Sequence, residues 1–61
     1  MYNDDVTITF KHYRTGEIIE MSGILPEVYN PERSDLYVLL RQDGTLEDIR
    51  KESVVKFEYL K

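Results

Sequence analysis

The sequence predicts a small all-β domain of five short strands, and three observations support that class. Apolar and polar residues alternate with a period of two in several stretches, as they do in strands with one buried face. Connections that contain glycine or proline separate these stretches. No repeat or low-complexity tract divides the 61 residues, so residues 1–61 are assigned to one domain.

The first strand is expected at residues 6–13, where the sequence VTITFKHY begins with a clean alternation. Val6, Ile8 and Phe10 would share one face, and the threonines between them would lie on the other. This pattern predicts a strand that is buried on one side only.

A hairpin is expected to link this strand to a second one at residues 17–25. Residues 14–16 supply a short connection, because Gly16 can adopt a positive φ. The second strand alternates less cleanly, and Gly23 interrupts it where a bulge or a sharp bend is expected. A long, bent strand of this kind can take part in two sheets of a small barrel.

Residues 26–34 form the one long loop, because Pro26 and Pro31 would each break a strand ladder. The third strand is expected at residues 35–41. Both of its faces are apolar, which predicts a central strand or one that a partner covers. The two faces carry Leu36, Val38 and Leu40 on one side and Tyr37 and Leu39 on the other.

The stretch LLRQDGTLEDIRKES, residues 39–53, predicts the rest of the topology. Asp43-Gly44 between apolar segments is typical of a tight hairpin turn, so a short fourth strand is expected at residues 45–49. Residues 50–53 fit a single helical or 3₁₀ turn. The fifth strand is expected at residues 54–60, with Val55, Phe57 and Tyr59 on one face and Val54, Lys56, Glu58 and Leu60 on the other.

Five short strands with a 3₁₀ turn before the last describe a five-stranded SH3-like or Sm-like small barrel. Residues 22–25, 36–40 and 54–57 also resemble YolD-like proteins of Gram-positive bacteria and their phages, which have a Gly-x-Ile stretch, an apolar strand and a final strand in this order. The resemblance implies an accessory role, since some members are proposed to act beside a translesion DNA polymerase. It supplies no catalytic residue. Residues 51–55 differ from the basic-glycine signature that lines the RNA pocket of Sm proteins.

Composition excludes several classes of function. Twelve acidic residues against eight basic ones give a formal net charge of −4, which disfavours a nucleic-acid partner because phosphate neutralisation drives much of that affinity. With no cysteine and one histidine, disulfides and a Cys/His zinc site are excluded. The lack of cysteine fits a reducing compartment, and no apolar run approaches the roughly 20 residues of a membrane span. We expect a cytoplasmic protein, in the host cytoplasm if a phage encodes it, with no membrane partner and no cofactor.

The acidic loop invites a metal or catalytic interpretation, which its spacing does not support. A calcium loop of the EF-hand type needs several oxygen ligands before the glycine and a bidentate glutamate at a fixed distance after it, where this chain has Arg50. Ser22, Ser34 and Ser53 lack the sequence context of an activated nucleophile. The carboxylates are expected to be solvated. The sequence therefore predicts a protein that is not an enzyme and has no metal site.

Five tyrosines beside two phenylalanines indicate a binding surface, because tyrosine combines a large apolar ring with a polar tip. We therefore expect a small non-enzymatic interaction module, a phage or bacterial accessory protein that binds a host or viral protein. A homo-oligomer is also expected, since so short a chain buries only a marginal core. The alternative is an Sm-like or OB-like single-stranded nucleic-acid binder whose tyrosines stack bases, and a purely structural role for the tyrosines stays open. The candidate binding residues are Tyr29, Arg33, Tyr37, Arg41 and Tyr13.

Overall fold

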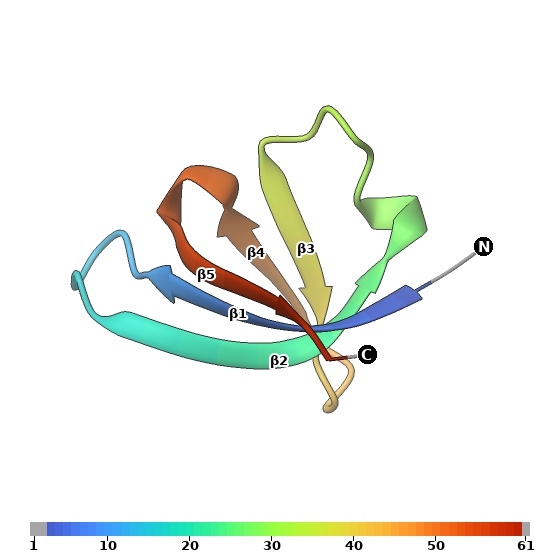
Figure 1. Ribbon diagram of the computed structural model, residues 1–61, viewed down its shortest axis with the longest axis horizontal. Coiled ribbons are helices and arrows are strands. Elements are labelled where there is room, and N and C mark those ends of the chain that lie inside the picture. The colour runs from blue at the N-terminus through green and yellow to red at the C-terminus, as the bar shows by residue number, and fades with distance from the viewer. Residues whose placement is uncertain (1–2, 61) are drawn as a thin grey trace.

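The computed structural model describes residues 3–60 as one open antiparallel sheet with the strand order β4-β3-β2-β1-β5 (Figure 1). All five predicted strands are present, so the all-β class is confirmed. No helix within the described residues is long and apolar enough to cross a membrane. The elements in chain order are β1 (Asn3–Lys11), β2 (Ile18–Pro26), the 3₁₀ turn η1 (Glu27–Tyr29), β3 (Leu36–Leu40), β4 (Leu46–Arg50), the 3₁₀ turn η2 (Lys51–Ser53) and β5 (Val54–Tyr59).

Strands β1 and β2 form the long hairpin that the sequence predicts. They pair in register from Asn3↔Pro26 to Lys11↔Ile18. The backbone N–H of His12 donates to the Glu17 carbonyl, and Gly16 takes the positive φ of 74° that was expected of it. Only glycine adopts such a φ without steric cost, so Gly16 sets the geometry of this turn.

Strand β2 curves from one part of the sheet to the other (Figure 1). Strand β2 pairs with β1 along its whole length, but its described pairing with β3 is the single position Ile24↔Leu40. Figure 1 shows β2 curving under the molecule while β3 and β4 run across β1 and β5. The interruption expected at Gly23 is not found, because β2 runs unbroken from Ile18 to Pro26 and keeps its register with β1 throughout; the strand curves instead. This curvature lets the sheet fold over its own inner face.

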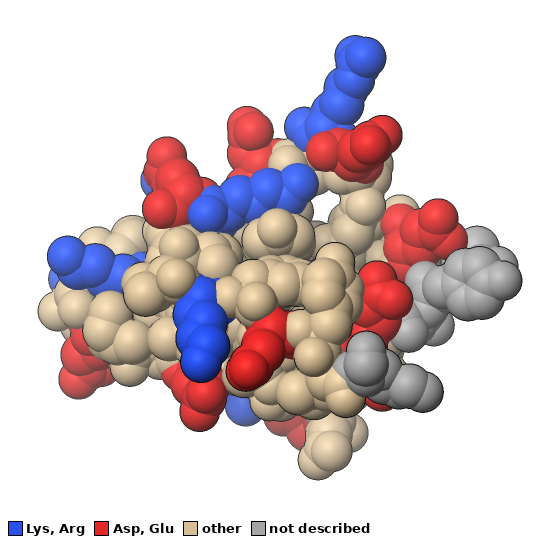
Figure 2. Space-filling view, viewed as in Figure 1, with Lys and Arg blue, Asp and Glu red and all other residues tan. Residues whose placement is uncertain are grey.

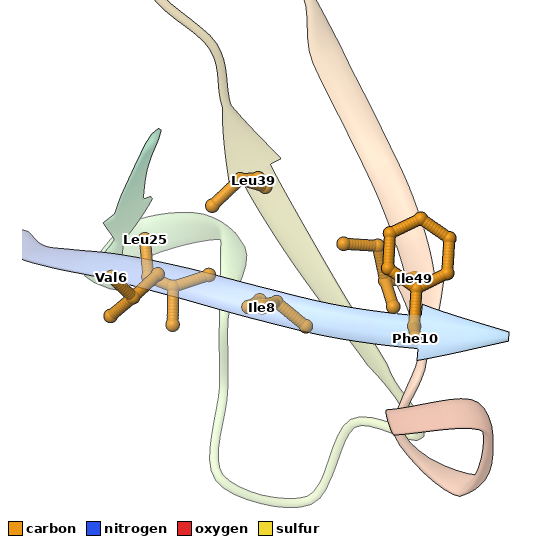
Figure 3. Packing of buried hydrophobic residues seen from close by; sticks show 6 residues of the cluster. All are labelled: Val6, Ile8, Phe10, Leu25, Leu39 and Ile49. Atoms are coloured by element: carbon orange, nitrogen blue, oxygen red, sulfur yellow. The ribbon is translucent and has the colours of Figure 1, made fainter. Parts of the chain in front are cut away.

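A small core fills the inner face of the bent sheet (Figure 3). Strand β1 supplies half of it, because its alternating apolar residues all point inward. Tyr37, Phe57 and the neighbouring half-buried apolar residues pack against this cluster. Fully or almost fully buried are Val6, Ile8, Phe10, Leu25, Leu39 and Ile49.

The two faces of β3 are unequal. Leu39 is completely buried and Tyr37 packs against the core, whereas Leu36, Val38 and Leu40 lie half-buried on the outer face. The predicted alternation is confirmed, and so is the central position of the strand between β4 and β2. The residues at the odd-numbered positions form the inner face.

One predicted face of the last strand is wrong. Val55 was placed with Phe57 and Tyr59, but its side chain is 64% exposed, and Val54 packs against the core instead. The cause is a register shift between Thr9 and Phe10, after which Phe10 pairs with Val54. An irregularity of this kind reverses the side-chain faces beyond it, because the strand period is two.

The acidic stretch between β3 and β4 is a turn. Gly44 has φ 89° and donates its N–H to the Arg41 carbonyl, which closes the turn that Asp43-Gly44 predicts. The Asp43 carboxylate accepts hydrogen bonds from the Thr45 hydroxyl at 2.7 Å and the Thr45 backbone N–H at 3.0 Å. These two bonds, the hydroxyl bond first, hold the pKa of Asp43 below its ordinary value. The carboxylate therefore has a structural use in the turn.

Candidate functional site

Three aromatic rings form a continuous row along the inner face of the sheet. The Tyr37 ring on β3 lies 5.1 Å from that of Phe57 on β5, and the Phe57 ring lies 5.0 Å from that of Tyr59 in an edge-on arrangement. Tyr37 and Phe57 are half-buried, while Tyr59 is 61% exposed. Ring pairs at these separations support one another beyond their buried area. The row therefore presents rigid aromatic surface at the edge of the core.

A groove runs beside this row, beneath the loop that joins β2 to β3. Its volume is about 540 Å³. We name it the aromatic groove, and Figure 2 shows the molecule hollowed beneath this loop. It is lined by Asp4, Leu25, Glu27, Asn30, Pro31, Glu32, Tyr37, Lys51 and Tyr59.

Asn30 fixes the loop that forms one wall of the aromatic groove. Its side-chain amide donates to the carbonyl oxygens of Pro26 at 2.8 Å and Val38 at 3.0 Å, and its side-chain oxygen accepts the Val38 N–H at 2.8 Å. The carboxamide thus pairs with β3 as a neighbouring strand would, two positions beyond the pairing of Leu40 with Ile24. The groove wall is held by the sheet and does not depend on a ligand.

The charge around the aromatic groove is mostly negative. Asp4, Glu27 and Glu32 lie on its rim, all three exposed. The one base in the lining is Lys51, whose ammonium nitrogen lies 5.1 Å from the centroid of the Tyr37 ring. That distance is within the range of a cation–π contact. The groove therefore combines an aromatic ring that can bind a cation with carboxylates that attract further positive charge.

The five predicted binding residues do not form one site. Tyr37 lies in the aromatic groove, and Tyr29, although 51% exposed on the nearby turn η1, is not part of the lining. Arg33 is exposed in the same loop. Arg41 lies at the β3–β4 turn, and Tyr13 lies 71% exposed at the tip of the β1–β2 hairpin. The candidates are dispersed because they lie on the β1–β2 hairpin, the β2–β3 loop, strand β3 and the β3–β4 turn.

Several residues of the aromatic groove and of the aromatic row beside it were missed from the sequence, among them Asn30, Lys51 and Tyr59 in the groove lining and Phe57 in the row. Phe57 and Tyr59 could have been found, because their alternation in VVKFEYL already places both rings on one face. Asn30 and Lys51 gave no local sign, since each acts through a residue distant in the chain, Val38 or Tyr37. Their roles depend on tertiary contact alone.

A larger hollow of about 960 Å³ lies on the other side of the bend in β2. Met21, Ile24, Leu40 and the 56% exposed Leu60 give it an apolar lining, and Arg41 is the base beside it. Three exposed carboxylates accompany this arginine. They belong to Asp5, Glu20 and Asp43.

A cluster of cations surrounds Tyr13 at the hairpin tip. The guanidinium carbons of Arg14 and Arg50 lie 5.6 Å and 6.0 Å from the centroid of the Tyr13 ring, and the His12 ring stacks on it at 5.3 Å and 13°. The Nδ1 atom of His12 accepts the backbone N–H groups of Arg14 at 3.1 Å and Thr15 at 3.4 Å. We name Lys11, His12, Tyr13, Arg14 and Arg50 the hairpin-tip cluster.

No family model, curated protein or solved structure matches this chain. The resemblance to YolD-like proteins therefore stays a prediction. The fold and the aromatic groove define the molecule as a small all-β protein with a preformed, acid-rimmed aromatic surface.

Proposed function

We propose that this chain is a small non-enzymatic interaction module that binds an extended, basic segment of a partner protein in the aromatic groove. The observation that carries the proposal is the Tyr37–Phe57–Tyr59 row beside exposed carboxylates. In this view the chain is an accessory or regulatory protein of a bacterium or phage, acting in the cytoplasm on a host or viral protein.

Aromatic surface supports the protein-binding part of the proposal. Tyrosine contributes a large contact area and loses little conformational freedom on binding, so it is enriched at interfaces and among the residues that dominate their energy. Tyr59 projects from the row with most of its ring exposed, and Tyr37 lies partly open beside it. A partner that covers these rings would bury apolar surface without any rearrangement of the core.

Charge supports the choice of a basic partner segment. The chain has a net charge of −4, and Asp4, Glu27 and Glu32 concentrate carboxylates at the groove. Figure 2 shows acidic side chains along the upper edge and the right end of the molecule, where the β2–β3 loop and the start of β1 lie. Complementary charge raises association rates and orients the partner. Lysine or arginine of the partner would also replace Lys51 over the face of Tyr37.

Preorganisation supports an extended segment as the occupant. The Asn30 hydrogen bonds hold the loop wall in place, so binding would not have to order it, and a groove between two walls accepts a single extended chain. The partner would insert apolar side chains between Pro31 and the tyrosine rings.

A selection from a random peptide library tests this function. The full chain is used as bait, and Tyr59→Ala serves as the counter-selection, since Tyr59 is exposed and its loss should not unfold the protein. We expect enriched peptides that are rich in Lys and Arg and that bind Tyr59→Ala about tenfold more weakly. Val28→Ala, which removes an exposed apolar side chain outside the groove, is the matched control. Enriched peptides without excess basic residues, or with equal affinity for Tyr59→Ala, would refute the proposal.

We also propose that the open sheet is a small barrel of the SH3-like or Sm-like type. The support is the strand order β4-β3-β2-β1-β5, the curvature of β2 (Figure 1) and the 3₁₀ turn η2 before the last strand.

We also propose self-association through the outer face of β2, β3 and β4, because Leu40 and the 49% exposed Leu46 stand opposite each other there beside Ile24. Mass measurement in solution tests it: Leu46→Lys should lower the mass of an oligomer, and a monomeric parent chain would rule it out.

A further inference from the structure

We propose that the hairpin-tip cluster binds a nucleotide, either free or as a unit of a single strand, with the base stacked on Tyr13 and the phosphate held by the surrounding cations. This site lies apart from the aromatic groove and does not depend on the function proposed for it. Its two parts are an exposed ring and converging positive charge.

The ring is presented for stacking. Tyr13 is 71% exposed at the end of the hairpin, and the His12 ring stacks on it at 5.3 Å and 13°, so a bound base would continue an existing stack. The Tyr13 hydroxyl also accepts a hydrogen bond from Nε of Arg14 at 3.1 Å, which fixes the ring relative to the guanidinium. Stacking of a base on an exposed aromatic ring is worth about 1–3 kcal/mol and tolerates any base.

Positive charge gathers at this place from three basic side chains, those of Lys11, Arg14 and Arg50. Arg14 in the β1–β2 turn and Arg50 at the end of β4 converge on one ring, and Lys11 lines the same hollow as Tyr13, together with Glu52. The volume of that hollow is about 370 Å³. Cations around one ring repel one another, and within the described residues Glu52 is paired with Arg50 alone among them. Figure 2 shows basic side chains projecting at the left end, where the hairpin tip lies in Figure 1.

Two nearby acids leave this charge available. Glu52 contacts Arg50 at 3.4 Å, but the two side chains are 76% and 62% exposed, and such a surface ion pair contributes little and exchanges readily. Glu17 accepts a weak hydrogen bond from the Thr15 hydroxyl at 3.5 Å. A phosphate can therefore displace Glu52 from Arg50.

His12 supplies a further donor to an anion. Its Nδ1 atom accepts two backbone N–H groups, so in the neutral ring the proton lies on Nε2. The same two hydrogen bonds hold the turn in which Arg14 lies. His12 thus positions Arg14 and offers an N–H group, while Lys11 and the two arginines provide charge.

Binding titrations with two probes test the site. The full chain, labelled with ¹⁵N, is titrated at low salt with AMP and, separately, with a short oligothymidylate, and amide shifts are followed. We expect the largest shifts at residues 11–16 and 50–55, and an affinity that falls steeply with salt. Binding of both probes, or of AMP alone, identifies a nucleotide site, and binding of the oligonucleotide alone identifies a single-strand site. No shift at low salt with either probe would overturn the proposal.

Three substitutions separate this site from a general charge effect. Tyr13→Ala should weaken the affinity about tenfold by removing the stack. Arg14→Gln should weaken the affinity. It should also reduce the slope of log affinity against log salt concentration by about one, because one fewer ion is released on binding. Lys56→Gln removes the same charge from the exposed middle of β5 and should leave the affinity nearly unchanged. An equal loss in Lys56→Gln, or unchanged binding in Tyr13→Ala, would contradict a site at the hairpin tip.

Discussion

The carbonyl oxygen of Leu40 lies 2.5 Å from the point where a Cβ atom on Gly23 would project. The side chain of Leu39 would lie only 3.1 Å from the same point. Backbone atoms of β3 therefore occupy the space that any other residue at position 23 would need. This close approach allows β3 to pair with β2 at the bend and places Tyr37 opposite β5.

Replacement of Gly23 by alanine should destabilise the fold through this contact. We expect Gly23→Ala to lower the free energy of unfolding by about 1–3 kcal/mol, because a carbonyl group in the ladder cannot move aside cheaply. The change in the urea midpoint measures it. Glu20→Ala is the matched control, since Glu20 is an exposed residue of the same strand. A loss in Glu20→Ala as large as that in Gly23→Ala would argue against the close approach.

Loss of the Asn30 carboxamide should release the loop above the aromatic groove. Asn30→Leu removes three hydrogen bonds and leaves the N–H and carbonyl groups of Val38 without their partner, so we expect a loss of about 2 kcal/mol. Amide hydrogen exchange should accelerate at Val38 more than at Leu39. A Val38 amide that stays as protected as in the parent chain would show that Asn30 does not hold the loop.

Truncation of Leu39 in β3 and of Leu46 in β4 should lower the free energy of unfolding by very different amounts. Leu39→Ala should cost about 2–5 kcal/mol, because this side chain is completely buried. Leu46→Ala should cost less than about 1 kcal/mol, because its side chain is 49% exposed on the outer face. Thermal unfolding of both variants measures the difference. Equal costs would mean that the inner and outer faces of the hairpin have been assigned wrongly.

The pH dependence of stability should contain a contribution from Asp43. Its pKa is lowered from the ordinary value of 3.8 by the Thr45 hydroxyl and then by the Thr45 N–H. A carboxyl whose pKa is lower in the folded state gives stability that is fully present above the unfolded pKa and is lost as the pH falls through the folded pKa. Asp43→Asn keeps an acceptor for Thr45 and should flatten the stability profile below about pH 4.

An NMR titration of the Asp43 carboxyl group checks the cause of this shift directly. In Thr45→Val, which lacks the hydroxyl donor, the pKa of Asp43 should rise toward its ordinary value. An unchanged pKa in this variant would assign the shift to another group, such as the nearby guanidinium of Arg41.

Much of the fold follows from local pattern. The five strands, the two turns at Gly16 and Gly44 and the 3₁₀ turn η2 were all predicted, because each depends on residues close together in the chain. The interruption expected at Gly23 did not occur, because β2 pairs regularly with β1 through that position. The face of β5 was assigned wrongly at Val54 and Val55. That assignment depends on a register shift opposite β1, and no residue of β5 itself reveals it.

The candidate site was predicted only in part. Tyr37 was chosen for its type and lies in the groove, whereas Tyr29 and Tyr13, chosen for the same reason, lie outside its lining. Arg33 and Arg41 were added because they are near the tyrosines in sequence, and neither lines the groove. The nucleic-acid alternative was disfavoured because of the net charge of the whole chain. Net charge does not describe the local charge at the hairpin-tip cluster.

The sequence alone determined the kind of element at each position, since alternation, glycine and proline act over a few residues. The tertiary structure decided which faces became the core and which side chains met. Asn30 reaches Val38, Lys51 reaches Tyr37 and Arg50 reaches Tyr13 across strands. Such contacts depend on the register and curvature of the whole sheet, which are set by packing between distant segments.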